Sequence, residues 1–377
     1  MKFERYNTHG ETGRFMADLK KALDASDNIL PSHGRTMNLK GALLEICDEL
    51  DGTEELDGYG HSEALSAFET EIAEMFGKEA AVFMPSGTMA QNTALRMWCE
   101  KRSNFTVAMH PTAHPEFAEH AGYLFLHNIR RLQFGVPESV GDRLLNIKDF
   151  EGLGQEPGVV LLELPNRPLG CQLRPWDDLI AIREWTQQRG IPLHLDGARI
   201  WQCRPFYQKS YAEIAALFDS VYVSFYKDIG TLCGSMLLGS APFIQEARIW
   251  QRRQGGNLFT QGPFWASAMI GVKRVLPQID GWVEIAQEAA SILSEFDPIS
   301  IVPNTPHVNM FRMYVRGNRE ALVDRHNELA TKMGTFVFKG LRPTVVPDTH
   351  VAEMHIWRNA TDFDMSRLRP FLEELFK

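Results

Sequence analysis

The chain has 377 residues, of which 44% are hydrophobic, and this length suits two domains better than a single core. Its formal net charge of −9 argues against a nucleic acid or an anionic membrane as the main partner. The five cysteines are odd in number and lack C-x-x-C spacing, so we expect neither disulfides nor a zinc site. We see no secretion signal and no apolar run of about eighteen residues, so we expect a soluble cytoplasmic protein.

Residues 1–55 combine short amphipathic helices with loops, and we expect this segment to pack on the core of the protein. A loop of small polar residues at 31–36 separates the two helical pieces and contains Ser32 and Arg35. Such a loop is typical of a solvated connection, but Ser32 and Arg35 are also able to reach into a cleft. Both interpretations stay open at this stage.

A predicted strand at 80–84 ends at Pro85-Ser86-Gly87-Thr88, and a predicted helix follows from residue 89 to 97. The first amides of a helix have no partner within it and the helix dipole favours negative charge, so this junction suits an anion. It is neither a Walker loop nor a dinucleotide-binding fingerprint. Capping of the helix by Ser86 or Thr88 is the simpler interpretation of this motif in isolation.

A predicted strand at 106–110 leads to three histidines and two carboxylates, among them His114 and Glu119. The H-E-x-x-H order is missing and no matching cluster occurs elsewhere, so we expect no metal site. A histidine after a strand is also able to lie flat on an aromatic ligand.

Two apolar segments end in single charged groups: residues 191–196 end in Asp196, and residues 219–224 are followed by Lys227. Buried parallel strands deliver such side chains to the carboxyl edge of a sheet. A carboxylate and an amine suit a pyridoxal-phosphate site, where lysine forms a Schiff base and aspartate keeps the ring nitrogen protonated. A buried ion pair and two unrelated surface charges are the alternatives.

Strands and helices alternate from residue 56 onward, which predicts an α/β fold with a mostly parallel sheet covered by helices on both faces. From about residue 275 the pattern changes to a smaller α+β domain. We therefore expect three parts: an N-terminal segment at 1–55, a large domain at 56–270 and a small C-terminal domain at 271–377.

Three motifs in this order, Pro85-Ser86-Gly87-Thr88, His194-Leu-Asp196-Gly-Ala-Arg199 and Ser224-Phe-Tyr-Lys227, resemble the threonine aldolase and β-eliminating lyase family. The interval of 31 residues from position 196 to position 227 is also similar to that family. The resemblance implies an aspartate aminotransferase-like fold, known as fold type I of the pyridoxal-phosphate enzymes, with pyridoxal 5′-phosphate as cofactor.

By this resemblance Lys227 binds the cofactor covalently and Asp196 pairs with its ring nitrogen. His114 is expected to stack on the ring or to act as a base, with Glu119 nearby, and Arg199 to grip the substrate carboxylate. Arg199 is expected to contact the cofactor as well. The remaining cofactor contacts implied by the resemblance are Ser86, Gly87, Thr88, Ser224 and, one position out of alignment, Arg252.

The resemblance implies a lyase for an amino acid, and we expect aldol cleavage of a β-hydroxy-α-amino acid to glycine and an aldehyde. A β-eliminating lyase, an aminotransferase and a non-catalytic protein of the same fold are the alternatives. The sequence departs from the family after the central strand, where Glu163-Leu-Pro-Asn166-Arg167 replaces Glu-Asn-Thr-His-Asn. Arg35 or Arg358 is a candidate for the lost charge, and Ser32 and Glu119 are further expected substrate contacts. A homodimer or homotetramer with shared active sites is implied as well.

Overall fold

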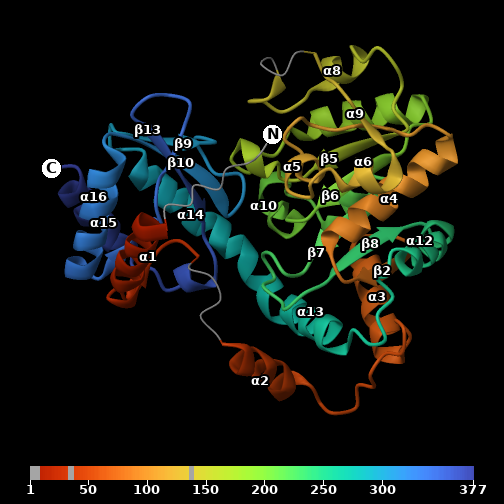
Figure 1. The fold of residues 1–377 in the computed structure, drawn as a ribbon, viewed down its shortest axis with the longest axis horizontal. Coiled ribbons are helices and arrows are strands. Elements are labelled where there is room, and N and C mark those ends of the chain that lie inside the picture. Colours follow the sequence, from red (N-terminus) through yellow and green to blue (C-terminus); the bar gives the residue numbers. More distant parts are fainter. Residues whose placement is uncertain (1–8, 33–37, 136–139) are drawn as a thin grey trace. The chain divides into compact units, whose positions relative to one another are not determined.

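The computed structural model describes residues 9–32, 38–135 and 140–377, with side chains described from residue 17 onward outside these gaps. The chain forms two compact units, one of Met37–Ile279 and one that joins Met1–Thr36 to Asp280–Lys377 (Figure 1). The division into domains at residues 55 and 270 stays a prediction. Within the described residues, none of the helices has both the length and the apolar character needed to cross a bilayer.

A seven-stranded sheet forms the centre of the larger unit. Its strands, in spatial order, are β2 (Ala80–Met84), β8 (Ser235–Gly239), β7 (Ser220–Ser224), β6 (Leu193–Gly197), β5 (Val159–Glu163), β3 (Thr106–Ala108) and β4 (Arg130–Leu132). The pairs from β7 to β4 are parallel, and β8 runs antiparallel to both of its neighbours. This mostly parallel sheet confirms the predicted α/β fold class.

The central strands β5, β6, β7 and β8 are five residues each and are buried along their whole length, as expected for strands covered on both faces, whereas the edge strand β4 is Arg-Arg-Leu and begins at an exposed residue. The helices of this unit are α2 (Leu39–Glu49), α3 (Glu63–Met75), α4 (Gly87–Arg102), α5 (His114–Phe117), α6 (Gly122–His127), α8 (Ile147–Glu151), α9 (Trp176–Gln188), α10 (Arg204–Tyr207), α11 (Tyr211–Ala215), α12 (Ala241–Arg253) and α13 (Gly262–Val275). Three short 3-10 turns are η1 (Arg167–Leu169), η2 (Ile200–Gln202) and η3 (Leu276–Gln278).

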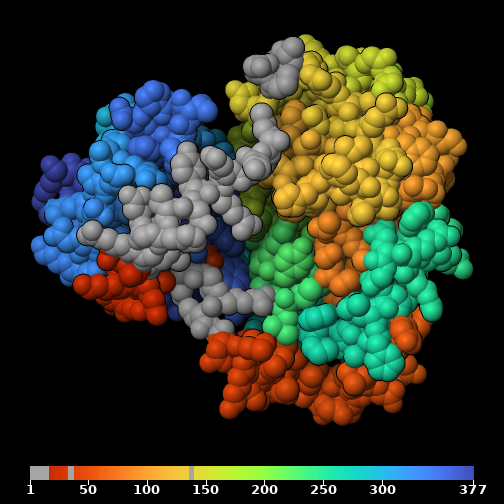
Figure 2. Space-filling view, in the orientation of Figure 1, coloured from red at the N-terminus to blue at the C-terminus, as the bar shows by residue number. Residues whose placement is uncertain are grey.

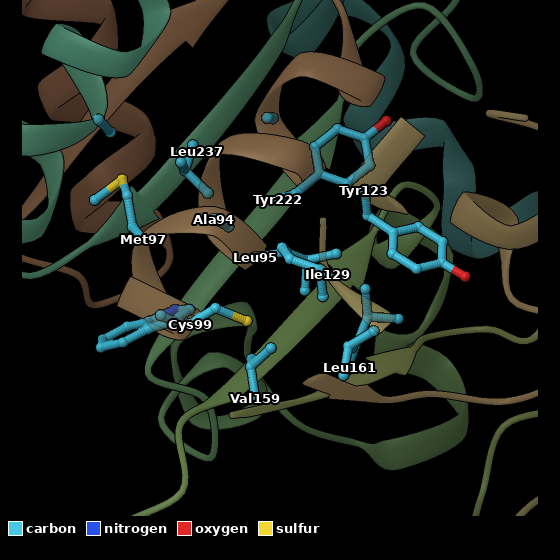
Figure 3. Close-up of a cluster of buried hydrophobic side chains, with 14 of the residues drawn as sticks. Ala94, Leu95, Met97, Cys99, Tyr123, Ile129, Val159, Leu161, Tyr222 and Leu237 are labelled. Atoms are coloured by element: carbon cyan, nitrogen blue, oxygen red, sulfur yellow. The ribbon is translucent and has the colours of Figure 1, made fainter. Parts of the chain in front are cut away.

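Helix α4 lies across the sheet and contributes much of the core, as Figure 3 shows. Its small residues Ala90 and Ala94 are wholly buried, which lets the helix approach β7 and β8 closely. Leu95 of α4 packs in the same cluster as Leu161 of β5 and Leu237 of β8. The close approach holds the first turn of α4 against the sheet.

The smaller unit contains a second, antiparallel sheet. Its strand order is β12 (Arg342–Pro343), β13 (Thr349–His355), β10 (Met310–Arg316) and β9 (Ile299–Val302). A separate parallel pair joins β1 (Asn28–Ile29) to β11 (Thr335–Phe336). The other elements are α1 (His9–Asp24), α14 (Ile279–Leu293), which begins at the last residue of the larger unit, α15 (Arg319–Met333), η4 (Arg358–Ala360), η5 (Met365–Arg367) and α16 (Leu368–Leu375). The predicted smaller α+β part is thereby confirmed.

Candidate active site

Two carboxyl side chains near the ends of β5 and β6 and a phenol in the middle of β7 stand in one row across three neighbouring strands. Glu163 of β5 is in register with Asp196 of β6, and Asp196 is in register with Tyr222 of β7. Register partners project from the same face of a sheet, so these side chains are neighbours. All three are buried. The sheet therefore gathers ionisable groups at a point from which water is largely excluded.

Glu163 is a buried carboxyl group that connects two loops. The pKa of Glu163 is raised to about 8, mainly by burial and secondly by the negative charge of Asp196. Its Oε1 accepts a hydrogen bond from the backbone N–H of His114 at 2.7 Å, and its Oε2 accepts one from Nδ2 of Asn166 at 3.0 Å. One side chain thus fastens the loop after β3 and the loop after β5 to the edge of the sheet.

Lys227 follows the end of β7 by three residues and lies within the electrostatic reach of Asp196. Burial lowers the pKa of Lys227, the charge of Asp196 opposes this, and the charge of Arg199 lowers the pKa further. A lowered pKa increases the fraction of neutral amine, the form that attacks a carbonyl group. One oxygen of Asp196 accepts the N–H of Ala198 at 3.1 Å. The two charged groups singled out in the sequence are therefore parts of one site.

His114 is the first residue of α5, and its ring is held by Glu119. The distance from His114 Nδ1 to Glu119 Oε1 is 2.9 Å, and the Glu119 side chain is only 2% exposed while that of His114 is 32% exposed. If the Glu119 oxygen accepts a hydrogen bond from Nδ1–H, the neutral ring is the Nδ1–H tautomer and Nε2 is left as the hydrogen-bond acceptor. The second oxygen of Glu119 is buried without a hydrogen-bond partner in the described part of the chain.

The Ser86-Gly87-Thr88 segment forms the start of α4. Ser86 is the N-cap residue, and its Oγ accepts the N–H of Met89 at 3.2 Å. A Cβ atom placed on Gly87 would lie 1.9 Å from the hydroxyl oxygen of Tyr222, so only glycine fits this contact. Thr88 is exposed. Ser86 thus caps the helix, and the anion-binding role of the segment stays a prediction.

Ser224, the last residue of β7, is a buried residue whose hydroxyl has no hydrogen-bond partner among the described residues. Its carbonyl oxygen accepts the indole N–H of Trp201 at 2.8 Å. A buried hydroxyl without a partner is unfavourable unless a ligand or water completes it. Ser224 therefore offers a hydrogen-bond donor to a bound group.

Arg199 lies just beyond β6 and contacts a carboxylate of the protein itself. Its Nη1 donates to Oδ1 of Asp228 at 2.7 Å, and the Asp228 side chain is completely buried. The sequence assigned Arg199 to a substrate carboxylate and gave no reason to expect this pair. The arginine is therefore already engaged at one of its nitrogens.

Other predicted site residues lie elsewhere or outside the described residues. Arg252 is exposed near the end of α12, and no contact described for it joins it to Lys227. Ser32 belongs to the smaller unit, where its N–H donates to the carbonyl of His355 at 2.6 Å. Arg35 falls outside the described residues. Arg358 lies in the smaller unit and its guanidinium covers the Trp357 ring. Their substrate roles stay predictions.

The histidines near residue 110 do not form a metal site in the described part of the chain. The ring of His110 is buried, with Nε2 3.0 Å from the carbonyl oxygens of both Val140 and Arg143. Across residues 9–32, 38–135 and 140–377, no three side chains of His, Cys, Asp or Glu are grouped so as to hold a metal ion. His110 therefore supports a loop.

Glu163, Tyr222 and Asp228 contribute to the site but were not chosen from the sequence. Glu163 ends a buried strand in the same way as Asp196, which is a signal that sequence reasoning could have used. Asp228 directly follows Lys227 and was equally visible. Tyr222 gave no signal, because an aromatic residue within an apolar strand is ordinary core.

A family model described as beta-eliminating lyase matches residues 52–317. A low specificity L-threonine aldolase of Escherichia coli O157:H7 is 31% identical over 223 residues, which cover 58% of this chain and 65% of that protein. The match therefore spans just under two thirds of the length of that relative.

Two solved structures are similar over nearly the whole chain. One is a putative L-allo-threonine aldolase from Listeria monocytogenes EGD-E, with a TM-score of 0.90 and 35% identity, covering 96% of this chain and 99% of that one. The other is a putative aromatic amino acid beta-eliminating lyase/threonine aldolase from Exiguobacterium, with a TM-score of 0.88 and 32% identity, covering 95% and 99% of the two chains.

Proposed function

Since the chain belongs to the β-eliminating lyase family, we propose that it is a pyridoxal-phosphate-dependent lyase that cleaves a β-hydroxy-α-amino acid of the threonine type to glycine and an aldehyde. The observation that carries this proposal is that Asp196 of β6 and Lys227, three residues beyond the parallel neighbour β7, lie close enough for their charges to interact. The names of the E. coli and Listeria relatives favour the aldol reaction.

The residues of the site fit pyridoxal phosphate. The hydroxyl of Ser224 lacks a partner among the described residues, and the first amides of α4 lie beside Gly87, so both suit the phosphate. Asp196 suits the ring nitrogen and Lys227 the aldehyde. The absence of a side chain at Gly87 lets the Tyr222 hydroxyl lie directly against the first turn of α4.

When bound, pyridoxal phosphate supplies a protonated ring that withdraws electrons from the α-carbon of an amino acid. The negative charge of Asp196 would keep that ring nitrogen protonated, and Arg199 would orient the substrate carboxylate. His114 Nε2 is the acceptor left by the Glu119 hydrogen bond. As a base it would take the proton of the substrate hydroxyl while the Cα–Cβ bond breaks and the aldehyde leaves, and the protonated imidazole would then hold the one proton that Cα needs to give glycine. Stacking of the His114 ring remains its second interpretation.

A spectrum and an aldehyde assay test the proposal. Purified protein is expected to be yellow with bound cofactor and to release acetaldehyde from L-threonine or L-allo-threonine. Lys227→Ala should lose both the colour and the release. A colourless wild-type protein that takes up no cofactor would contradict the proposal.

β-Elimination is the second candidate reaction, because the Exiguobacterium relative is named for both activities. Elimination breaks the Cα–H bond and expels a leaving group from Cβ. Release of pyruvate and ammonia from serine or cysteine, with no acetaldehyde from threonine, would assign the protein to elimination.

We also propose a homo-oligomer in the cytoplasm. Helix α2, at the lower edge of Figure 2, carries the exposed side chains of Leu39, Leu43 and Leu44, and exposed Tyr59 packs edge-on against exposed Phe259. Apolar side chains gathered on a surface favour association.

The five cysteines are all free, which agrees with a reducing compartment.

A further inference from the structure

The guanidinium of Arg199 is held by the residue next to Lys227. Its Nη1 donates to Oδ1 of Asp228 at 2.7 Å, and the two side chains are 13% and 0% exposed. Ion pairs on the surface contribute little to stability because water competes for both charges. This pair is shielded from water and lies inside the candidate site.

Burial makes the contact between these two side chains favourable. A buried carboxylate is very unfavourable without a cation, so Asp228 and Arg199 stabilise each other, and Asp228 restrains the position of the guanidinium. A guanidinium is rigid and planar with five N–H donors, so fixing one terminal nitrogen restricts the orientation of the whole group. No other hydrogen bond of the Arg199 side chain occurs within the described residues. Its other N–H groups thus remain for a ligand.

We infer that Asp228 is a positioning residue that orients Arg199 for the carboxylate of the amino-acid substrate. The inference rests on the proposed function. Two-point contact between a guanidinium and a carboxylate requires both groups to share a plane, and Asp228 sets that plane before the substrate arrives. Asp228 acts through the arginine.

Asp228 also balances the charge of Arg199 at Lys227. The positive charge of Arg199 lowers the pKa of Lys227, and the negative charge of Asp228 raises it. In cofactor-free protein, Asp228→Ala should therefore lower the apparent pKa for labelling of Lys227 by trinitrobenzenesulfonate. This measurement requires neither cofactor nor turnover, and Lys227→Ala identifies the labelled amine.

The decisive experiment compares L-serine with 2-aminoethanol, which differ only in the carboxylate. Binding of each to the cofactor-loaded protein is followed by the change in cofactor absorbance. Asp228→Ala should weaken the binding of L-serine by about tenfold or more and leave the affinity for 2-aminoethanol unchanged within about twofold. Equal weakening of both ligands, or unchanged or tighter binding of L-serine, would overturn the inference.

A matched control weakens another Arg–Asp ion pair, one whose aspartate lies before β7, whereas Asp228 lies after that strand. Asp219, just before β7, accepts from Nη1 of Arg183 at 2.8 Å, and Asp219→Asn should leave the ratio of the two affinities unchanged. If Asp228→Ala does not fold, Asp228→Asn keeps the size and shape of the side chain. This variant should still weaken the binding of L-serine, but not that of 2-aminoethanol, by about threefold. An equal loss for both ligands again overturns the inference.

This test separates the inference from the proposed function. A protein that binds L-serine but releases no aldehyde from threonine contradicts the proposed reaction and leaves the comparison of affinities valid. An active aldolase whose Asp228→Ala variant keeps the wild-type affinity ratio contradicts only the role of Asp228.

Discussion

Glu163 links the protonation of the site to the stability of the larger unit. Its pKa is raised from the ordinary value of 4.5 to about 8, so the folded protein binds a proton more tightly there than the unfolded chain does. A raised folded-state pKa contributes stability that is complete below about pH 4.5 and is lost as the pH rises through about 8. The stability of cofactor-free protein should therefore contain a component that declines over this range.

Replacement of this carboxyl group tests that component. The free energy of unfolding is measured by urea denaturation without cofactor for Glu163→Gln and for the wild type. The value for Glu163→Gln minus the value for the wild type should increase as the pH rises from 5 to 9, by on the order of a few kcal/mol at most. The exposed Glu213 supplies the control, because its pKa is lowered and it stays ionised throughout. A constant difference for Glu163→Gln over the whole range would show that the carboxyl group is ionised at pH 5.

Gly87 tests the close contact between α4 and β7. In Gly87→Ala the new Cβ would lie 1.9 Å from the Tyr222 hydroxyl oxygen, and the first turn of the helix would have to move. We expect a loss of about 1–3 kcal/mol in the free energy of unfolding, together with weaker cofactor uptake.

A second helical glycine provides the control for this substitution. Gly281 in α14 has open space around its Cβ position, and Gly281→Ala should be neutral or stabilising by up to about 1 kcal/mol. Unchanged stability and cofactor uptake in Gly87→Ala would mean that the junction tolerates a side chain and is not held against Tyr222.

At the scale of an element, α4 is a capped helix whose first turn is expected to bind the cofactor phosphate. Ser86→Ala removes the hydrogen bond to the N–H of Met89 and should cost about 1 kcal/mol of stability. Because the same turn is proposed to hold an anion, the variant should also bind pyridoxal phosphate more weakly, as measured by titration of its absorbance.

The cap of α3 separates these two effects. Ser62 accepts the N–H of Leu65 at 3.2 Å, the distance found for Ser86 and Met89, so Ser62→Ala should lose similar stability without loss of cofactor affinity. Equal cofactor affinities in the two variants would remove the phosphate role of Ser86.

At the scale of the whole molecule, cofactor binding should stabilise the fold. A ligand that binds only the folded state at a hundred times its Kd adds about 2.7 kcal/mol to the free energy of unfolding. Removal of pyridoxal phosphate should therefore lower the Tm by a few degrees in a calorimetric scan. Lys227→Ala, which lacks the covalent attachment, should show a smaller shift, and an equal shift would mean that the lysine does not contribute to retention.

Much of the fold followed from patterns along the chain. The apolar strand runs, the alternation of strands and helices from residue 56 and the change of pattern near residue 275 predicted the mixed architecture, because burial on both faces of a parallel sheet requires continuous apolar segments. The antiparallel direction of β8 was not predicted. The direction of a strand depends on how its connection crosses the sheet, and that is not encoded in its own residues.

By itself, the sequence determined the kinds of groups at the site: an amine and a carboxylate after buried strands, and a glycine at a strand–helix junction. It determined these because strand ends and helix starts are local features with short-range signals. Only the tertiary structure decided the row formed by Glu163, Asp196 and Tyr222, and the pairing of Arg199 with Asp228. Register between strands and contact between loops depend on residues far apart in the chain, so the partners, burial and charge of each group emerge only when the sheet is assembled.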